Sequence, residues 1–428
     1  MNPRDFTRRL RTAVGVVALL VVAAASAQTV DDRPEVKADV VSHITDIVEH
    51  NAYVPGVDFG KWPKYLAEVK PKLDAANNDE DFAKAINEAL SKFGTTHLGL
   101  LTPRRDDSFW TNSMVGIGVS VQRQDDGSLI VVRTVPDAPA ARGGIVPGDS
   151  IVEVDGKKTE GTTAGIVGKE GTDVNLTIKH TDGKTEHFVL TRRAYSMARP
   201  EELTWLNDDT AKLSVYSFDY SYDADNVAHL MKQVDEKAKN LILDLRDNGG
   251  GAVINMDHLL GMLMPADKPL GVFVDRRQIA EYVKTGGKAT DFVGLAKWAK
   301  RMEMPHPNRD VPVFHGNIIV LLNAFSGSAS EISAAALHDQ VNATVIGTKS
   351  AGAVLVSIVA GVSNGFGMQY PLSDFITVKG VRLEGNGVTP DVVAKEPRVK
   401  LPGDKDTVVD AAMQFLAQAK KTGGKTGG

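Results

Sequence analysis

The chain has 428 residues, of which 42% are hydrophobic and 24% are charged, as in a folded globular protein large enough for more than one hydrophobic core. The formal net charge is only -5 and the lysines and arginines are scattered, so we expect no nucleic acid partner. There is no cysteine, which excludes disulfides and cysteine nucleophiles. The histidines lack H-E-x-x-H spacing, so we expect no metal site and no cofactor.

The N-terminus has the pattern of an export signal. Arginines precede an apolar run at residues 13–25, and Ala25-Ser26-Ala27 offers small residues at a cleavage site. The run is short for a membrane span, and no later apolar segment reaches the length of about 18 residues that a span needs. We expect residues 1–27 to be a signal peptide and the mature protein to be periplasmic or secreted, with no stable membrane span.

A helical N-terminal module follows, which we place at residues 28–110. Apolar residues recur at three- and four-residue spacings between Pro34 and Leu90, which predicts amphipathic helices. Gly94 has the position of a glycine that ends the last helix. His97 then lies in a loop that enters a short apolar run.

Residues 111–195 predict a small, mostly β domain, because short β-prone runs alternate with Asp-Gly turns. Within it, Gly116-Ile117-Gly118-Val119 leads into a strand, and its backbone N–H groups suit a peptide's terminal carboxylate. Residues 138–151 resemble the short helix and Pro-Gly-Asp turn of PDZ domains. We therefore expect Gly116, Ile117, Gly118 and Val119 to bind C-terminal or apolar peptide ends.

Residues 196–403 predict an α/β core. Apolar strands alternate with helices, which indicates a mixed sheet that helices cover on both faces. Residues 267–312 have the pattern of an insertion, and we assign them no chemistry. The C-terminal segment, residues 404–428, predicts a helix at 407–419 and then a flexible tail.

Ser328 lies in a small-residue turn between the apolar strand at 318–322 and an alanine-rich helix. A serine at a helix start has backbone N–H groups and the positive end of the helix dipole beside it, which suits a nucleophile. Ser328 and Glu331 also have the spacing of a capping box. The turn is not a G-x-S-x-G elbow, since Ser326 and Ser330 replace the glycines. This stretch alone leaves capping and catalysis both open.

A glycine-rich loop follows another buried strand, in the sequence Leu-Asp-Leu-Arg-Asp-Asn-Gly-Gly-Gly at residues 243–251. Successive glycines let the backbone approach a ligand closely and aim an N–H at it. The loop lacks the spacing of a Rossmann fingerprint and the lysine of a P-loop, so nucleotide binding is not indicated.

Together, five stretches in the same order resemble the C-terminal-processing (tail-specific) and tricorn-core-like family of serine peptidases. They are residues 95–100, the PDZ-like run, residues 243–251, residues 326–332 and residues 384–391. The resemblance implies an α/β fold: a mixed-sheet peptidase core with an inserted PDZ domain and an N-terminal helical module. It also implies that Ser328 is the nucleophile, with its oxyanion held by the N–H groups of Ala329 and Gly250.

The base departs from the dyad type of this family. The position where dyad enzymes carry a lysine holds Ala353, and Lys349 comes four residues too early. The tricorn-like branch instead uses a histidine preceded by a hydroxyl residue and supported by a glutamate. Thr96, His97 and Glu384 match that pattern, with Thr96 relaying between the other two. A neutral imidazole can accept the serine proton near neutral pH, and a carboxylate can stabilise the imidazolium.

The expected function is that of an exported serine endopeptidase acting on proteins or peptides, which its PDZ domain binds, for example by their C-terminal tails. Because Ala353 replaces the lysine, a catalytically inactive PDZ-containing peptide-binding protein is the alternative. An esterase or a carrier of hydrophobic ligands on the same core is a third possibility.

Overall fold

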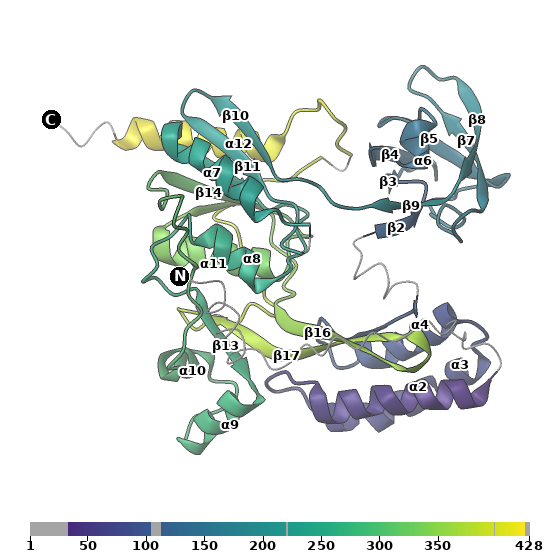
Figure 1. The fold of residues 1–428 in the computed structure, drawn as a ribbon, viewed down its shortest axis with the longest axis horizontal. Coiled ribbons are helices and arrows are strands. Elements are labelled where there is room, and N and C mark those ends of the chain that lie inside the picture. The colour runs from purple at the N-terminus through teal and green to yellow at the C-terminus, as the bar shows by residue number, and fades with distance from the viewer. Residues whose placement is uncertain (1–32, 104–112, 220, 398, 424–428) are drawn as a thin grey trace.

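The computed structural model describes residues 33–103, 113–219, 221–397 and 399–423, so the predicted signal peptide lies outside the described residues. Three parts are visible in Figure 1: an α/β core, a small β domain beside it, and a group of helices packed on a β ribbon. Within the described ranges, no helix is both long and apolar enough to cross a membrane.

The core is a six-stranded sheet in which one antiparallel pair extends four parallel pairings, so the predicted mixed sheet is confirmed. Its strands β12 and β14 are almost wholly buried, as their continuous apolar runs indicate. In sheet order the strands are β10 (Glu202–Asn207), β11 (Thr210–Ser214), β12 (Asn240–Asp244), β14 (Asn317–Leu322), β15 (Thr344–Gly347) and β18 (Val392–Val393).

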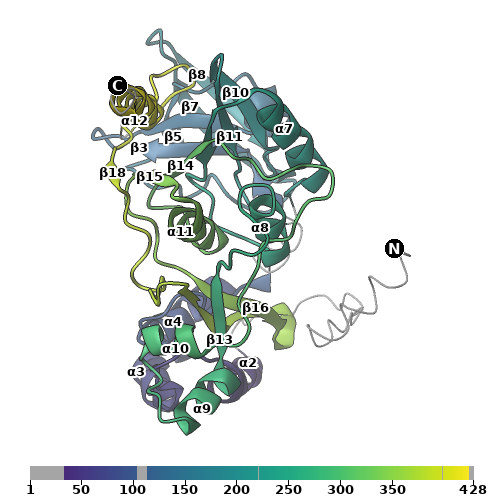
Figure 2. The same cartoon turned by 90° about the vertical axis from the view of Figure 1, so that its left-hand side faces the viewer.

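Helices cover both faces of this sheet because alternate strand residues point to opposite sides. Leu241 and Val320 pack with the helices of one face, whereas Ile242 and Ile319 pack against the other. The first face holds α7 (Ala224–Lys237), α8 (Val253–Leu260) and α11 (Ala329–Val341), and the second holds α12 (Thr407–Gly423). Figure 2 shows α12 on the opposite side of the sheet from α8 and α11.

Helix α12 is longer than the sequence predicts. The sequence predicts a flexible tail from Lys420, yet residues 420–423 continue the helix. One physical reason is that Lys420 Nζ donates to Asp209 Oδ2 at 2.9 Å, which ties the last turns of the helix to the core.

A second sheet lies below the core and centres on the eleven-residue strand β17 (Gly367–Thr377). It contains β1 (Gly99–Leu101), β13 (Gly271–Asp275) and β16 (Leu355–Gly361), all antiparallel to β17. β13 belongs to the segment interpreted as an insertion, which is followed there by α9 (Arg276–Lys284) and α10 (Phe292–Trp298). Part of this segment is therefore integral to the fold, because β13 pairs with β17 along its whole length.

The N-terminal helices pack on this second sheet. Their buried side chains share one hydrophobic cluster with β16 and β17, and the rings of Phe82 and Phe366 lie 5.9 Å apart. Gly94 has the positive φ of 64° expected of a glycine that ends a helix. The elements are α2 (Pro34–Asp46), η1 (Ile47–Asn51), η2 (Phe59–Lys61), α3 (Trp62–Ala75) and α4 (Asp79–Ser91), with η3 (Ser363–Gly365) opposite α2.

The small β domain has the five-strand sheet order β3-β4-β5-β7-β8, so β3 is an edge strand. A two-stranded ribbon of β2 (Ser113–Gly116) and β9 (Arg193–Ser196) forms its connection to the rest of the chain (Figure 1). The remaining elements are β3 (Val119–Arg123), β4 (Leu129–Thr134), α6 (Pro139–Arg142), β5 (Ser150–Val154), β6 (Lys157–Lys158), β7 (Asp173–Lys179) and β8 (Thr185–Thr191).

Candidate active site

Ser328 lies on a strained turn between β14 and α11. Its backbone angles are φ 53° and ψ -119°, a region that non-glycine residues rarely occupy. This sharp strand-to-helix turn is typical of a nucleophile elbow, which exposes a serine at the end of a sheet. The sequence motif of such an elbow is absent, because Ser326 and Ser330 stand where its glycines would be. Both serines are buried and form hydrogen bonds: Ser326 Oγ donates to the Leu245 carbonyl and Ser330 Oγ to the Asn248 carbonyl.

The capping box predicted for Ser328 and Glu331 is present in the structure. The fully buried Glu331 carboxylate accepts the Ser328 N–H at 3.1 Å, while the Glu331 N–H donates to the Ser328 carbonyl oxygen at 2.9 Å. The Ser328 hydroxyl faces the Glu331 N–H as in a capping box, but it forms no side-chain cap hydrogen bond. The hydroxyl is therefore not committed to the start of the helix.

Glu331 has a second role that the sequence does not reveal. Its carboxylate also accepts from Ser350 Oγ at 2.5 Å, Gly352 N at 2.8 Å and Ala353 N at 2.9 Å. Burial raises the pKa of Glu331, and these hydrogen bonds oppose that shift. Glu331 therefore holds the loop at residues 350–353 against the nucleophile turn. Only the fold brings this loop to Glu331, so no local pattern could have identified these contacts.

The structure brings Thr96, His97 and Glu384 together. Glu384 accepts the Thr96 N–H at 2.9 Å and the Thr96 hydroxyl at 2.9 Å, and Thr96 Oγ1 lies 2.7 Å from His97 Nδ1. Because the hydroxyl proton is donated to Glu384, the imidazole must donate its Nδ1 proton to Thr96 Oγ1. This hydrogen-bond pattern assigns the His97 tautomer in which Nε2 has a free lone pair, as a general base requires.

The environment of His97 favours the neutral ring. Burial lowers the pKa of the His97 imidazole below its ordinary value of 6.5, and the Glu384 carboxylate opposes this shift. The backbone of His97 has a positive φ of 55°, which is uncommon outside glycine. His97 lies in the loop between α4 and β1, and its ring lies beside Thr96.

Two consecutive residues connect the nucleophile to this group. The Ala353 carbonyl accepts the Ser328 N–H at 2.8 Å, and the Val354 N–H donates to Glu384 Oε2 at 2.8 Å. The position expected to hold a dyad lysine is thus occupied by a small residue that contributes backbone contacts. Among the residues that the structure describes, no hydrogen bond joins the Ser328 hydroxyl to the His97 ring.

The glycine loop approaches Ser328 closely. A Cβ on Gly250 would lie 2.6 Å from Ser328 Cβ, and Gly250 has a φ of 103°, so a side chain cannot be accommodated. The Gly250 N–H donates to Asn248 Oδ1 at 2.9 Å. The Ala329 N–H, in contrast, has no hydrogen-bond partner within the described part of the chain. Of the two predicted oxyanion donors, only Ala329 is therefore free in this structure.

Asn248 was not identified from the sequence. It is fully buried, and its carbonyl accepts from Gly327 N at 3.0 Å and Ser330 Oγ at 2.9 Å. Its amide nitrogen donates to the Val215 carbonyl at 2.9 Å. Asn248 therefore joins the glycine loop to both sides of the nucleophile. A polar residue directly before three glycines, at the end of a buried strand, is the signal that could have indicated it.

The predicted peptide-binding residues line a cavity of about 100 Å³ in the β domain. Gly116, Ile117, Gly118 and Val119 form one wall, and Ile166 and Val167 lie among its other lining residues. Gly118 has a φ of 75°, and a Cβ there would lie 2.2 Å from Ala138 Cβ, so this turn requires glycine.

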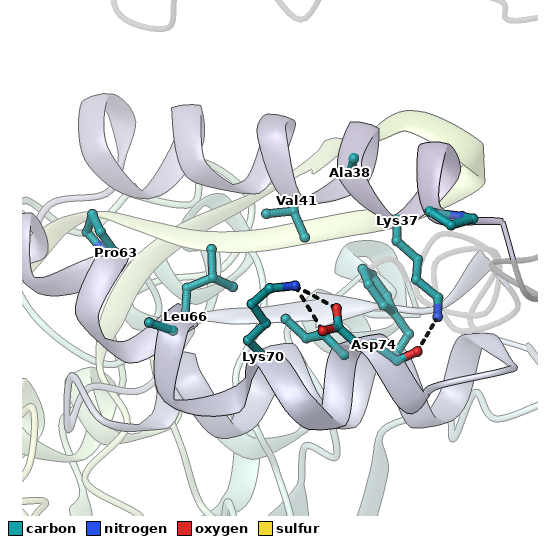
Figure 3. A pocket seen from close by; sticks show the side chains of 11 residues that line it. Lys37, Ala38, Val41, Pro63, Leu66, Lys70 and Asp74 are labelled. Atoms are coloured by element: carbon teal, nitrogen blue, oxygen red, sulfur yellow. Dashed lines mark hydrogen bonds and ion pairs between the residues drawn. The ribbon is translucent and has the colours of Figure 1, made fainter.

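A larger apolar pocket of about 630 Å³ lies among α2, α3 and α4 (Figure 3). Val41, Leu66 and Phe82 line it, and the Lys70–Asp74 ion pair lies at its side. None of the predicted site residues lines this pocket. Within the described residues, no group of three or more histidine, aspartate or glutamate side chains could hold a metal ion.

Two parts of the chain match known protein families. Residues 209–394 match the Peptidase family S41, and residues 111–178 match the PDZ domain. The first match contains Gly250, Ser328 and Glu384, whereas Thr96 and His97 lie before both matches.

Curated relatives share about a quarter of the sequence. A "Probable CtpA-like serine protease" of Staphylococcus haemolyticus (strain JCSC1435) is 25% identical over 319 residues, which cover 72% of this chain and 59% of that protein. A "Carboxyl-terminal-processing peptidase 3, chloroplastic" of Arabidopsis thaliana is 26% identical over 356 residues, which cover 78% and 63%. The chain therefore spans less than two thirds of the length of these relatives.

Solved structures share the fold. A photosystem II D1 C-terminal processing protease matches with a TM-score of 0.50 and 20% identity, covering 87% of this chain and 95% of that one. A putative S41 protease from Bacteroides fragilis NCTC 9343 has a TM-score of 0.55 and 16% identity, covering 79% and 90%. The sequence motifs and both family matches agree: residues 209–394 of the chain form a domain of the Peptidase family S41, and residues 111–178 form a PDZ domain.

Proposed function

We propose that this chain is an exported serine endopeptidase that hydrolyses peptide bonds of proteins or peptides. Ser328 is the nucleophile, His97 the general base, Thr96 and Glu384 its support, and Ala329 and Gly250 the oxyanion donors. The hydrogen-bonded series from Glu384 through Thr96 to His97 is the observation on which this rests, because it leaves His97 Nε2 free to accept a proton.

The chemistry follows from these contacts. Ser328 Oγ attacks the scissile carbonyl carbon while its proton moves to His97 Nε2. The negative charge of Glu384, relayed by Thr96, stabilises the imidazolium. His97 then gives this proton to the leaving amine, and a water activated by the same imidazole hydrolyses the acyl-enzyme.

Two adjustments accompany substrate binding in this proposal. The Ser328 hydroxyl forms its hydrogen bond to His97, as catalytic hydrogen bonds often tighten only in the substrate complex. The Gly250 N–H leaves Asn248 Oδ1 and turns toward the oxyanion, a rotation of the peptide plane that the absence of side chains at Gly249 and Gly250 permits.

The PDZ domain supplies substrate binding in this proposal. Its strand β3 is an edge strand, so an extended peptide can pair with it, and the glycine turn at residues 116–118 lies where the peptide would end. Export rests on the predicted signal peptide alone. After its removal the protein is periplasmic or secreted.

The deciding experiment is labelling of the mature protein with a fluorophosphonate, which reacts with activated serines. We expect labelling of the wild type and its loss in Ser328→Ala and in His97→Ala, with both variants folded. His50→Ala is the matched control, because His50 is exposed and its ring bonds to Asp46, far from the nucleophile in the sequence. Full labelling of His97→Ala would overturn the assignment of the base.

A catalytically inactive peptide-binding protein is the second candidate. It is favoured by the engaged Gly250 N–H and by the absence, within the described residues, of a Ser328–His97 hydrogen bond. A folded wild type that binds peptides but neither reacts with fluorophosphonate nor cleaves them would establish this alternative. Turnover of acyl esters without turnover of peptides would instead indicate an esterase.

A further inference from the structure

The PDZ groove presents backbone donors at the place where a peptide carboxylate would bind. The carbonyls of Ile117 and Gly118 accept from Ala140 N at 2.9 Å and Val135 N at 2.8 Å. These bonds fix the turn, while the Ile117 N–H has no acceptor among the residues that the structure describes. Because β3 is an edge strand directly after this turn, an incoming peptide strand would end at these N–H groups.

Tyr195 from β9 reaches into the same place. It lies opposite Met114 in the β2–β9 ribbon, and its ring covers Gly116: a Cβ there would lie 3.7 Å from Tyr195 Cε1 and 3.8 Å from the hydroxyl oxygen. Tyr195 also lines the cavity formed by Gly118 and Val119. An aromatic side chain often covers a glycine on a neighbouring strand, which accounts for the ring but not for the position of the hydroxyl.

The hydroxyl of Tyr195 lies over the glycine turn, and two donors act on it. Burial raises the pKa of Tyr195, and the Arg133 guanidinium and the Gly118 N–H both oppose that shift. A backbone N–H and a nearby guanidinium are donors that a carboxylate prefers.

We propose that the Tyr195 hydroxyl occupies the position of a peptide's C-terminal carboxylate in the PDZ groove, so that a C-terminal peptide binds by displacing it. This rests on the proposed peptide binding by the groove, and it does not require that Ser328 be catalytic. A neutral phenol is a weaker ligand for these donors than a carboxylate, which offers two charged oxygens. The Tyr195 hydroxyl therefore lowers the affinity of the groove for every peptide, and peptide ends without a free carboxylate bind most weakly.

The test is a titration of the full chain with a short peptide that ends in valine, either as the free carboxylate or as the amide. Ser328→Ala is the background, so that the peptide is not cleaved. Tyr195→Phe keeps the ring over Gly116 and removes only the hydroxyl. Since a hydrogen bond contributes about 1 kcal/mol, we expect this variant to bind the free peptide roughly five-fold more tightly. The amide must displace the same hydroxyl, so its binding should tighten by a similar factor and stay weaker than that of the free peptide.

Tyr216→Phe is the matched control, since Tyr216 is also a half-buried tyrosine but its hydroxyl bonds to Glu202 at 3.1 Å, outside the cavity. Equal or weaker binding of the free peptide by Tyr195→Phe would overturn the proposal, because the hydroxyl would then be neutral or would assist binding. Absence of binding in both proteins would overturn it as well.

A second measurement needs no peptide. In the free protein, Tyr195→Phe should shift the amide NMR resonance of Gly118, whereas Tyr216→Phe should leave it in place. An unchanged Gly118 resonance would contradict the contact. Fluorophosphonate labelling of Ser328 reports separately on the peptidase proposal. The two proposals can therefore fail independently.

Discussion

The nucleophile and the base of this site are built in different ways. Ser328 stands on a strained turn that is fixed from within the core, by Asn248 and by the buried carboxylate of Glu331. His97 is oriented by Thr96 and Glu384, which are 288 residues apart in the chain. The first arrangement is built from segments of the α/β core alone, whereas the second needs the segment after the N-terminal helices to meet the core. Substitutions should therefore affect the two sides differently.

Gly250→Ala should have the largest effect, because the added methyl group would clash with the turn that carries Ser328. A Cβ at this position would lie 2.6 Å from Ser328 Cβ and 2.9 Å from the Gly327 carbonyl oxygen. We expect fluorophosphonate labelling of Ser328 to fall roughly 1,000-fold through loss of an oxyanion donor and displacement of the turn. Gly144→Ala also places alanine at a positive φ but meets no atom within 4 Å, so it is the control. Equal rates in the two variants would contradict the close approach.

Glu331→Gln should reduce both stability and labelling. The carboxylate accepts four hydrogen bonds, so an amide would turn its NH₂ group toward two of the four donors. We expect unfolding to become easier by about 2–4 kcal/mol, measured by urea denaturation. A stability equal to the wild type would show that this carboxylate does not hold the loop at 350–353.

Glu384→Gln tests the base side. We expect the rate of labelling or peptide cleavage to fall about 100-fold, because the imidazolium loses its counter-charge. The thermal unfolding temperature should change less than in Glu331→Gln, since the amide oxygen can still accept the Val354 N–H. A greater loss of stability than of activity would mean that Glu384 is mainly structural.

Thr96→Ser and Thr96→Val separate the relay from packing. Serine keeps the hydroxyl that bonds Glu384 and His97, so we expect nearly normal labelling. Valine has a similar shape but no hydroxyl, and we expect a loss on the order of ten-fold from misorientation of the imidazole. If both variants label alike, Thr96 does not act as a relay.

The pH dependence should show the smallest effect. His97 must be neutral to accept a proton, and burial lowers its pKa below 6.5. Activity should therefore persist as pH falls through 6.5 and be lost only at lower pH. Because the Glu384 carboxylate raises the pKa of His97, Glu384→Gln should move this acid limb further down. A limb at or above pH 6.5 in the wild type would contradict the burial of the base.

The local parts of this molecule could be predicted from the sequence. The apolar strand at β14, the small-residue turn and the helix at α11 place Ser328 correctly, and the Asp-Gly turns of the β domain divide its strands. The pairing of Thr96 with Glu384 was anticipated only through a family resemblance, because no local pattern connects residues so far apart.

Other features depend on contacts that no pattern along the chain shows. The strained turn at Ser328 is accompanied by hydrogen bonds from its N–H to Glu331 and to Ala353. β13 looked like part of an insertion because its partner β17 comes about a hundred residues later. The Gly250 N–H was expected to be free, yet the preceding asparagine reaches back to it.

The β2–β9 ribbon is a point at which the β domain could be replaced by another domain. The domain is entered through β2 and left through β9, where Ser113 lies opposite Ser196, so the two crossing points are neighbours. A different domain with adjacent termini could be joined there without reordering the rest of the chain. The helices before His97 offer no such freedom, because their hydrophobic cluster includes β16 and β17. Exchange of a whole domain is therefore possible at the ribbon and excluded at the N-terminal helices.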